Sequence, residues 1–217
     1  MKKKTPLNRA FSALTGDPVD KLVAAAKKGD VTAVKIRLRR GANVNQKDSF
    51  GDNALIVAVL AGHVQVVRLL LEKGANPDEK SPLGNTALIL ASWNGHTEIV
   101  RLLAEGGADL NKKNTHGNTP LILAAMHNRI EVARLLLAKG ANPDEKGDKG
   151  FTALDLATAM GFTEVAQILS GQSPAPEKNK HDAEEMEKII RAAIAQKQQL
   201  LKQMAQRGKP VIRPPQP

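Results

Sequence analysis

The chain of 217 residues contains no cysteine and no tyrosine, and it has only one tryptophan and four phenylalanines. The absence of cysteine excludes disulfide bonds, thiolate metal sites and a cysteine nucleophile. Because aromatic residues make up only 2% of the chain, any core must be built from Leu, Val, Ile and Ala. Such side chains suit many small repeated interfaces better than one large core. The apolar content of 41% is still enough for a packed structure.

Long apolar runs are also missing from this sequence. No stretch approaches the roughly 18 consecutive apolar residues that a membrane span needs. The basic start, MKKKTPLNRAFSALTGDP, contains no continuous apolar run of the length of a secretory signal before Asp17 and Pro18. We therefore expect a soluble, cytoplasmic protein that is not transmembrane.

The motifs of several common chemistries are missing too. The sequence contains no GxSxG, no phosphate-binding GxxxxGK[ST], no HExxH and no calcium-loop spacing. The acidic stretch NPDEKGDKG, from Asn142 to Gly150, has the charges for calcium but not the order of ligands. We therefore expect no enzymatic activity, no metal, no cofactor and no small-molecule substrate.

The net charge of +10 is concentrated at the two ends of the chain. Residues 1–40 contain eleven Lys or Arg against three Asp, which gives +8. Residues 41–171 carry twelve basic against fourteen acidic side chains, and residues 172–217 carry nine against five. The middle of the chain is therefore close to neutral, and the basic character belongs to its flanks.

A polar heptapeptide, GANPDEK, occurs twice and reveals a repeat. Its copies begin at Gly74 and Gly140, and the related strings GANVNQK and GADLNKK begin at Gly41 and Gly107. These four glycines are each separated by 33 residues. Such a fixed period is typical of a solenoid, in which each unit must stack on its neighbours to bury its apolar face.

Each unit contains two short apolar-periodic runs followed by a polar connection. The first run, such as TPLILAAMHN, ends at Gly62, Gly95, Gly161 or Asn128, which are residues suited to the left-handed conformation at a helix end. The second run, such as VQVVRLLLEKG, has charges on one face and ends at a glycine. The connections are rich in Asn, Pro, Asp and Gly, which predicts projecting hairpin-like turns.

This pattern resembles the ankyrin-repeat family. The stretches DSFGDNALIVAVLAGHVQVVRLLLEKGANPDEK, SPLGNTALILASWNGHTEIVRLLAEGGADLNKK and THGNTPLILAAMHNRIEVARLLLAKGANPDEK match the Thr-Pro-Leu, Gly-His and Gly-Ala-Asp-x-Asn positions of that family. The resemblance covers residues 18–171. It implies an all-α repeat solenoid of about five stacked helix–turn–helix units joined by hairpin-like turns, with a C-terminal helix added.

Three departures from the family pattern are visible. Ile56, Ile89, Ile122 and Asp155 stand where the family usually has His, so apolar packing should replace a side-chain hydrogen bond. Asn128-Arg129 replaces Gly-His in the fourth unit and is expected to loosen or reorient that turn. The first unit carries basic residues on both helices, which suits a polar N-terminal cap.

The resemblance also implies a protein–protein interaction module, an adaptor, scaffold or regulator that binds an unidentified partner protein on a concave surface of hairpin tips and first helices. In this family the contact positions vary, and here several of them are large and apolar. We expect Trp93 and Met126 to form the centre of the site and to face water, and ordinary packing between neighbouring first helices is the other interpretation. The candidate partner-binding residues are Phe50, Leu83, Trp93, Asn94, His116, Met126, His127 and Met160. In contrast, His63 and His96 are interpreted as turn residues that tie one unit to the next.

An alternative function is electrostatic recruitment of the repeats to nucleic acid or an anionic membrane surface through residues 1–40. The residues of this basic patch are Lys2, Lys3, Lys4, Lys35, Arg37, Arg39 and Arg40. The segment lacks interleaved aromatic residues for base stacking and has no groove-reading motif. Any polyanion contact is therefore expected to be weak, and a solvated cap is the other interpretation.

The sequence after the repeats predicts a separate helix. The stretch HDAEEMEKIIRAAIAQKQQLLKQMAQRGKP has an acidic start, a basic end and terminal Gly208 and Pro210. Its apolar stripe suits a cap on the end of the stack, a partner-binding or self-associating helix, or a free helix. The expected organisation is a basic segment (1–17), repeat units (18–50, 51–83, 84–116, 117–149 and 150–171), a linker (172–180), an amphipathic helix (181–208) and a disordered Pro-rich tail (209–217).

Overall fold

The computed structural model describes residues 18–171 and four positions of the C-terminal part, 188, 191, 192 and 195. Contacts within the chain divide it into two compact units, residues 1–174 and 175–217. The predicted N-terminal segment, linker and Pro-rich tail lie outside the described residues. Within the predicted C-terminal helix, Lys188, Arg191, Ala192 and Ala195 are helical and exposed. None of the helices among the described residues is long and apolar enough to cross a membrane.

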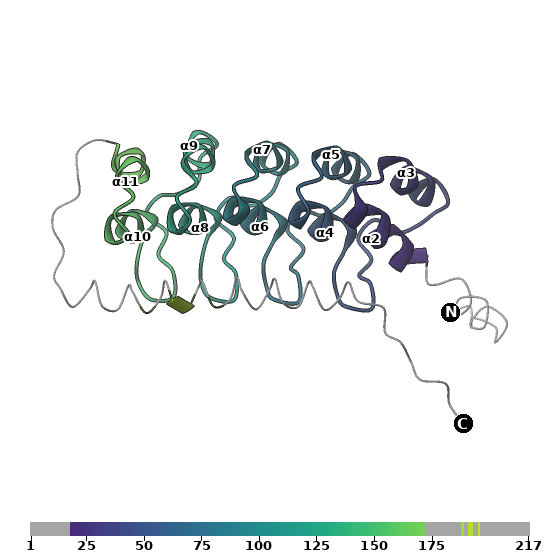
Figure 1. The fold of residues 1–217 in the computed structure, drawn as a ribbon, viewed down its shortest axis with the longest axis horizontal. Helices are drawn as coiled ribbons and strands as arrows, with labels where there is room; N and C mark the ends of the chain where they lie inside the picture. Colours follow the sequence, from purple (N-terminus) through teal and green to yellow (C-terminus); the bar gives the residue numbers. More distant parts are fainter. Residues whose placement is uncertain (1–17, 172–187, 189–190, 193–194, 196–217) are drawn as a thin grey trace, which may run out of the picture. The chain divides into compact units, whose positions relative to one another are not determined.

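Within residues 1–174, the described part consists of helices in two rows (Figure 1). The first helices of the pairs are α2 (Pro18–Lys28), α4 (Ala54–Leu60), α6 (Ala87–Asn94), α8 (Pro120–Met126) and α10 (Ala153–Ala159). The second helices are α3 (Val31–Arg39), α5 (Val64–Glu72), α7 (Thr97–Glu105), α9 (Ile130–Ala138) and α11 (Thr163–Ser170). Each helix packs on its pair partner and on the same helix of the adjacent pair. The expected all-α repeat solenoid is thus confirmed.

Each first helix from α4 onward begins at a capped residue. The side chains of Asn53, Thr86, Thr119 and Thr152 accept hydrogen bonds from the backbone N–H three residues later, at 2.8–3.3 Å. These bonds satisfy N–H groups that a helix start leaves without a partner. The carboxylate of Asp155, one of the departures from the family pattern, accepts a hydrogen bond from the N–H of Thr152 at 3.0 Å and completes a capping box.

The turn within each helix pair requires a left-handed residue. Gly62, Gly95 and Gly161 have φ of 74°, 79° and 70°, and Asn128 takes the same region with φ of 51°. The N–H of Arg129 bonds to the carbonyl of Ala124 at 2.8 Å, and His63 and His96 make the equivalent bond at 3.0 Å. The expected loosening of the fourth turn is therefore wrong, because Asn tolerates this conformation and the backbone bonds persist.

The core lies between the two rows and continues from one pair to the next. Leu70, Leu103 and Leu136, which are 33 residues apart, are all 0% exposed. Ile56, Ile89 and Ile122 are also buried, as expected for apolar packing at that position. Every residue of α8 is buried, whereas only one side of α9 is. The first helices therefore contribute the middle layer of the solenoid, and the second helices face solvent.

Polar side chains of the repeated heptapeptide join adjacent hairpins. The N–H groups of Asn76, Asp109 and Asn142 donate to the side-chain oxygens of Asn45, Asp78 and Asn111 at 2.7–3.1 Å. Each donor lies 31 residues after its acceptor. The heptapeptide recurs, in physical terms, because each copy must accept a hydrogen bond from the next one.

Candidate partner-binding surfaces

The hairpin tips and the first helices form the surface that the family resemblance implies for binding. The loops project from the first-helix side of the two rows, between successive pairs (Figure 1). Helices α4, α6 and α8 contain no charged residue, and α10 contains only Asp155. Because nearly all residues of α4, α6 and α8 are buried, a partner on this side would meet mainly the hairpin tips and the ends of the first helices.

Each hairpin tip is a tight turn closed by a glycine. The N–H groups of Gly51, Gly84, Gly117 and Gly150 donate to the carbonyls three residues earlier at 2.8–3.2 Å, with φ between 65° and 81°. In the third hairpin, Asn114 Oδ1 accepts from the N–H groups of His116 and Asn118 at 2.9 and 3.0 Å. The backbone of each tip is thereby fixed independently of the two residues at its centre.

The residues at the tip centres are the most exposed of the candidate site. The side chain of Phe50 is 51% exposed, His116 is exposed and Leu83 is half-buried. Thr115 Oγ1 lies 3.2 Å from His116 Nδ1 and donates to the carbonyl of Leu83 at 3.3 Å, which links the second and third tips. The structure therefore places Phe50, Leu83 and His116 along one series of tips.

The expectation that Trp93 and Met126 face water is wrong. Trp93 is 3% exposed and Met126 is 2% exposed. The Trp93 ring stacks on the half-buried His127 imidazole of the next unit, with ring centroids 5.6 Å apart and an angle of 19° between the planes. Among the described residues, Trp93 Nε1 has no hydrogen-bond acceptor. Both residues therefore belong to the packing beneath the surface rather than to an exposed patch.

Asn94 and Met160 lie at the ends of first helices and are half-buried. Asn94 Nδ2 donates to the carbonyl of Leu90 in its own helix at 3.0 Å. Met160 follows the last turn of α10, where its N–H bonds to the carbonyl of Leu156 at 3.0 Å. These positions border the hairpin series, and their side chains are only partly available to a partner.

His63, one of the two turn histidines predicted to tie one unit to the next, connects neighbouring units. His63 Nε2 donates to the carbonyl of Lys27 at 3.0 Å, 36 residues earlier. Arg129 occupies the corresponding position of a later unit, and its Nε donates to the carbonyl of Trp93 at 3.1 Å, also 36 residues earlier. Arg129 thus makes the same inter-unit bond as His63 does. The motif alone does not predict this equivalence. The His ring and the Arg guanidinium differ in shape and have in common only an N–H group that can donate.

The N-terminal unit forms a second candidate surface. Arg37 lies in the register of Leu70, Leu103 and Leu136, where the other units bury leucine, and it is only half-buried. Lys35, Arg39 and Arg40 are exposed. Lys2, Lys3 and Lys4 of the predicted basic patch lie outside the described residues. The described part of the patch therefore consists of four cations at the N-terminal end of the stack, beside α2 in Figure 1.

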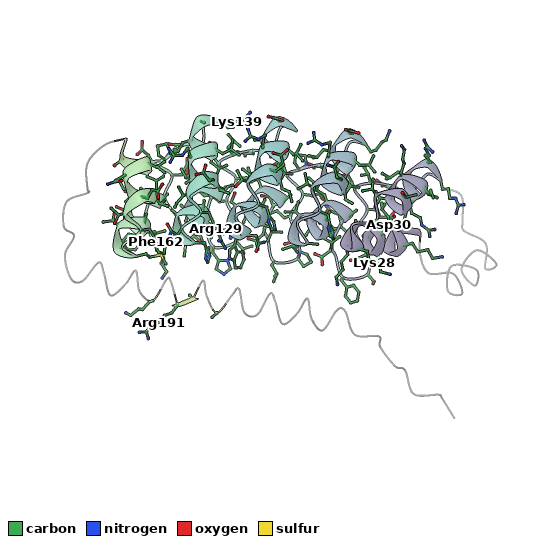
Figure 2. The ribbon with its side chains drawn as sticks, turned by 45° about the horizontal axis from the view of Figure 1, so that its top comes forward. Lys28, Asp30, Arg129, Lys139, Phe162 and Arg191 are labelled. Carbon is green, nitrogen blue, oxygen red and sulfur yellow. The ribbon has the colours of Figure 1, made fainter. Side chains whose placement is uncertain are left out.

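Elsewhere, cations of the second helices pair with acids of the next or preceding unit. Arg68 Nη2 lies 3.4 Å from Glu98, and Arg134 Nη2 lies 3.9 Å from Glu164. Lys139, labelled in Figure 2, pairs with Glu105 at 3.3 Å. These exposed pairs contribute little stability individually. They do show that the outer surface of the later units is locally neutralised.

The first unit lacks an acid that corresponds to Glu105, and the second lacks one that corresponds to Glu98. Lys35 corresponds to Arg68, but Gln65 stands where Glu98 would supply its partner. Arg39 corresponds to Glu105. Lys73 follows Arg39 by 34 residues, which is the separation between Glu105 and its partner Lys139. Sequence reasoning missed Gln65 and Lys73. The comparison of Gln65 with Glu98, Glu131 and Glu164 at the 33-residue period could have found them.

Comparison with known families gives one match. The family model for ankyrin repeats, in three copies, matches residues 22–114 and 107–182. No curated protein matches the chain. The two matched ranges cover well over half of the chain and include every helix pair among the described residues.

The burial of Trp93 generates a stability prediction. Trp93→Ala should lower the free energy of unfolding by about 3 kcal/mol, because it leaves a cavity against His127. Trp93→Phe keeps a ring at that position and removes an N–H, so it should cost less than about 1.5 kcal/mol. Urea denaturation followed by far-UV circular dichroism measures both changes. A loss below about 1 kcal/mol for the alanine variant would show that the ring is not part of the packing.

His96 generates a prediction about pH. Burial, and secondarily the guanidinium of Arg129, lower the pKa of His96 from its ordinary value of 6.5. The unfolded chain therefore takes up a proton at a higher pH than the folded chain does. As the pH falls through about 6.5 toward the lowered folded value, this difference reduces the stability of the fold.

Denaturation at a series of pH values from about 8 to 5 tests this linkage. His96→Gln should flatten the dependence of the unfolding free energy on pH, and Arg129→Gln should flatten it less, since burial remains. Parallel pH profiles for wild type and His96→Gln would contradict the assignment.

Proposed function

The chain belongs to the ankyrin-repeat family, and we propose from this that it is a non-catalytic module binding a partner protein on the surface of hairpin tips and first helices. Ankyrin repeats are generally protein–protein interaction modules, and the family is typically non-enzymatic. The partner site of the proposal is the series of tips, with Phe50, Leu83 and His116 at its centre. Asn94, His127 and Met160 lie at its border, and Trp93 and Met126 support it from below.

The observation that carries this proposal is internal variation on a repeated framework. The tip centres read Ser49-Phe50, Pro82-Leu83, Thr115-His116 and Asp148-Lys149, while a glycine with positive φ follows each of them. The glycine, the first-helix cap and the backbone turn are repeated because the fold requires them. The two central residues of each tip differ between units, and this variation within an otherwise repeated framework supports recognition at the tips.

The properties of these tips suit a protein partner. Phe50 offers an exposed aromatic ring, and aromatic residues are enriched at interface centres. Helices α4, α6 and α8 place no charge beneath the tips, so they would repel neither an acidic nor a basic partner. The apolar stripe predicted for residues 181–208 also supports association of that segment with a partner helix or a second copy. A cytoplasmic location agrees with this role and is part of the same proposal.

A comparative binding experiment tests the proposed surface. Phe50→Ala combined with His116→Ala should weaken partner binding at least about tenfold, with unchanged thermal unfolding, because both side chains are exposed. Proteins captured by the immobilised wild-type chain are identified and then titrated against each variant. Glu131→Ala with Gln167→Ala, on exposed positions of α9 and α11, is the matched control. If the control loses the partner and the tip variant keeps it, the binding surface lies on the second helices.

A second candidate function is recruitment of the repeats to a polyanion by the N-terminal unit. The specific observation in its favour is the missing ion-pair series described above. Among the described residues, Lys35, Arg39, Arg40 and Lys73 form no ion pair with an acidic side chain. An uncompensated group of cations raises the local concentration of an anionic partner and speeds its association.

A further inference from the structure

We propose that the N-terminal end of the stack is a docking surface for an anionic lipid bilayer, an inference that rests on the second of the two proposed functions and names its ligand. The surface, called here the basic face, consists of Lys35, Ile36, Arg39, Arg40 and Lys73. All five side chains are exposed. The first four belong to α3 and its C-cap, and Lys73 is the C-cap of the adjacent α5.

Stabilisation of helix ends does not account for the whole basic face. A cation at a helix C-terminus interacts favourably with the helix dipole, and Arg40, Lys73 and Lys139 all occupy C-cap positions. That role explains Arg40 and Lys73. Arg39 also lies in the last turn of α3, although the second and third units have Glu72 and Glu105 at this register. Lys35 lies in the middle of α3, so the helix dipole does not explain it.

The exposed residues of α3 combine charge with aliphatic side chains. Among the described residues, the large hydrophobic side chains that are exposed are Val31 at 37%, Ile36 at 41% and Phe50 at 51%. Two of these three lie on α3. At about 100° per residue, Ile36 falls beside Thr32, Arg39 and Arg40 on the side opposite the buried Val34, and Lys35 lies midway between Val34 and Ile36. Ile36 is therefore flanked by two cations on the exposed side of the helix, with a third at its edge.

This combination favours a lipid surface over nucleic acid. An anionic bilayer attracts basic side chains to its headgroups and accepts aliphatic side chains beneath them. A nucleic acid backbone would use the cations but offers no favourable site for Ile36. Residues 18–40 also contain no aromatic side chain that could stack on a base. The charge and the exposed aliphatic residues are both used only in the lipid-bound arrangement.

Two substitutions that restore the missing ion pairs test the proposal in the full chain. Arg39→Glu recreates the Glu105–Lys139 arrangement opposite Lys73, and Gln65→Glu recreates the Arg68–Glu98 arrangement opposite Lys35. Because the later units already contain these pairs, the double variant should keep its thermal unfolding midpoint. It changes the charge of the basic face by two and that of the neighbouring position 65 by one, so binding to vesicles of equal parts phosphatidylserine and phosphatidylcholine should fall about 100-fold.

A control variant with the same change in total charge separates local from global electrostatics. Lys146→Glu with Gln167→Glu changes exposed positions far along the sequence from the first unit and should leave vesicle binding within about threefold of wild type. Ile36→Gln, with all cations retained, should weaken vesicle binding about threefold or more, since less apolar surface enters the headgroup region. Equal losses for the two charge variants would overturn the proposal, as would an unaffected Ile36→Gln.

Binding of duplex DNA at the same salt concentration distinguishes docking on lipid from general recruitment to a polyanion. Salt-sensitive binding of vesicles, weak binding of DNA and no binding of pure phosphatidylcholine vesicles would support the lipid proposal. Tight DNA binding that Arg39→Glu with Gln65→Glu abolishes and Ile36→Gln leaves unchanged would overturn it while retaining polyanion recruitment. Failure of the wild-type chain to bind either anionic vesicles or DNA would overturn both.

Discussion

The structure depends on burial between helix pairs. A pair of helices of seven to eleven residues cannot bury its apolar side by itself, so each described pair uses its neighbours as the missing part of its core. Hydrogen bonds at fixed offsets hold these interfaces in register. Lys47 Nζ, for instance, donates to the carbonyl of Lys80 at 3.1 Å, and Lys80 Nζ donates to the carbonyl of Lys113 at 3.0 Å, in each case 33 residues later. The strict 33-residue period of the sequence is a consequence of this constraint.

The same constraint divides the surface into fixed and free positions. Residues that cap helices, close turns or bond to the next hairpin cannot change without weakening an interface. The helix caps and turn glycines do not determine which side chains stand at the tip centres or on the exposed side of α3, although Thr115 donates to the carbonyl of Leu83 in the preceding tip. Different residues can therefore occur at each tip, and the first two units can have Arg39 and Gln65 where later units have Glu without loss of core packing. The two proposed binding functions both use positions at which the side chain differs between units.

The glycine period and the cap residues were enough to predict the fold, because each reflects a local requirement that recurs in the sequence. Left-handed glycines appear in the structure where the pattern places them, and the Thr residues of the Thr-Pro-Leu positions cap the first helices. The candidate site could be predicted only in part. Phe50 and His116 are exposed as expected, but Trp93 and Met126 are buried. Exposure at the end of a first helix depends on what the following unit places against it, here His127, and a single repeat does not contain that information. Arg129 shows the same limit, because its bond to Trp93 is a contact between units.

The stability of chains shortened one unit at a time from the C-terminal end tests the dependence on neighbouring units most directly. The account predicts that chains ending at residues 171, 149 and 116 unfold at successively lower urea concentrations, with one interface lost at each step. A chain ending at residue 50, which retains only α2 and α3, should show no cooperative transition, because fewer than about three stacked units do not bury a sufficient core. A cooperatively folded helix pair in that shortest chain, or equal stability across the series, would contradict the account.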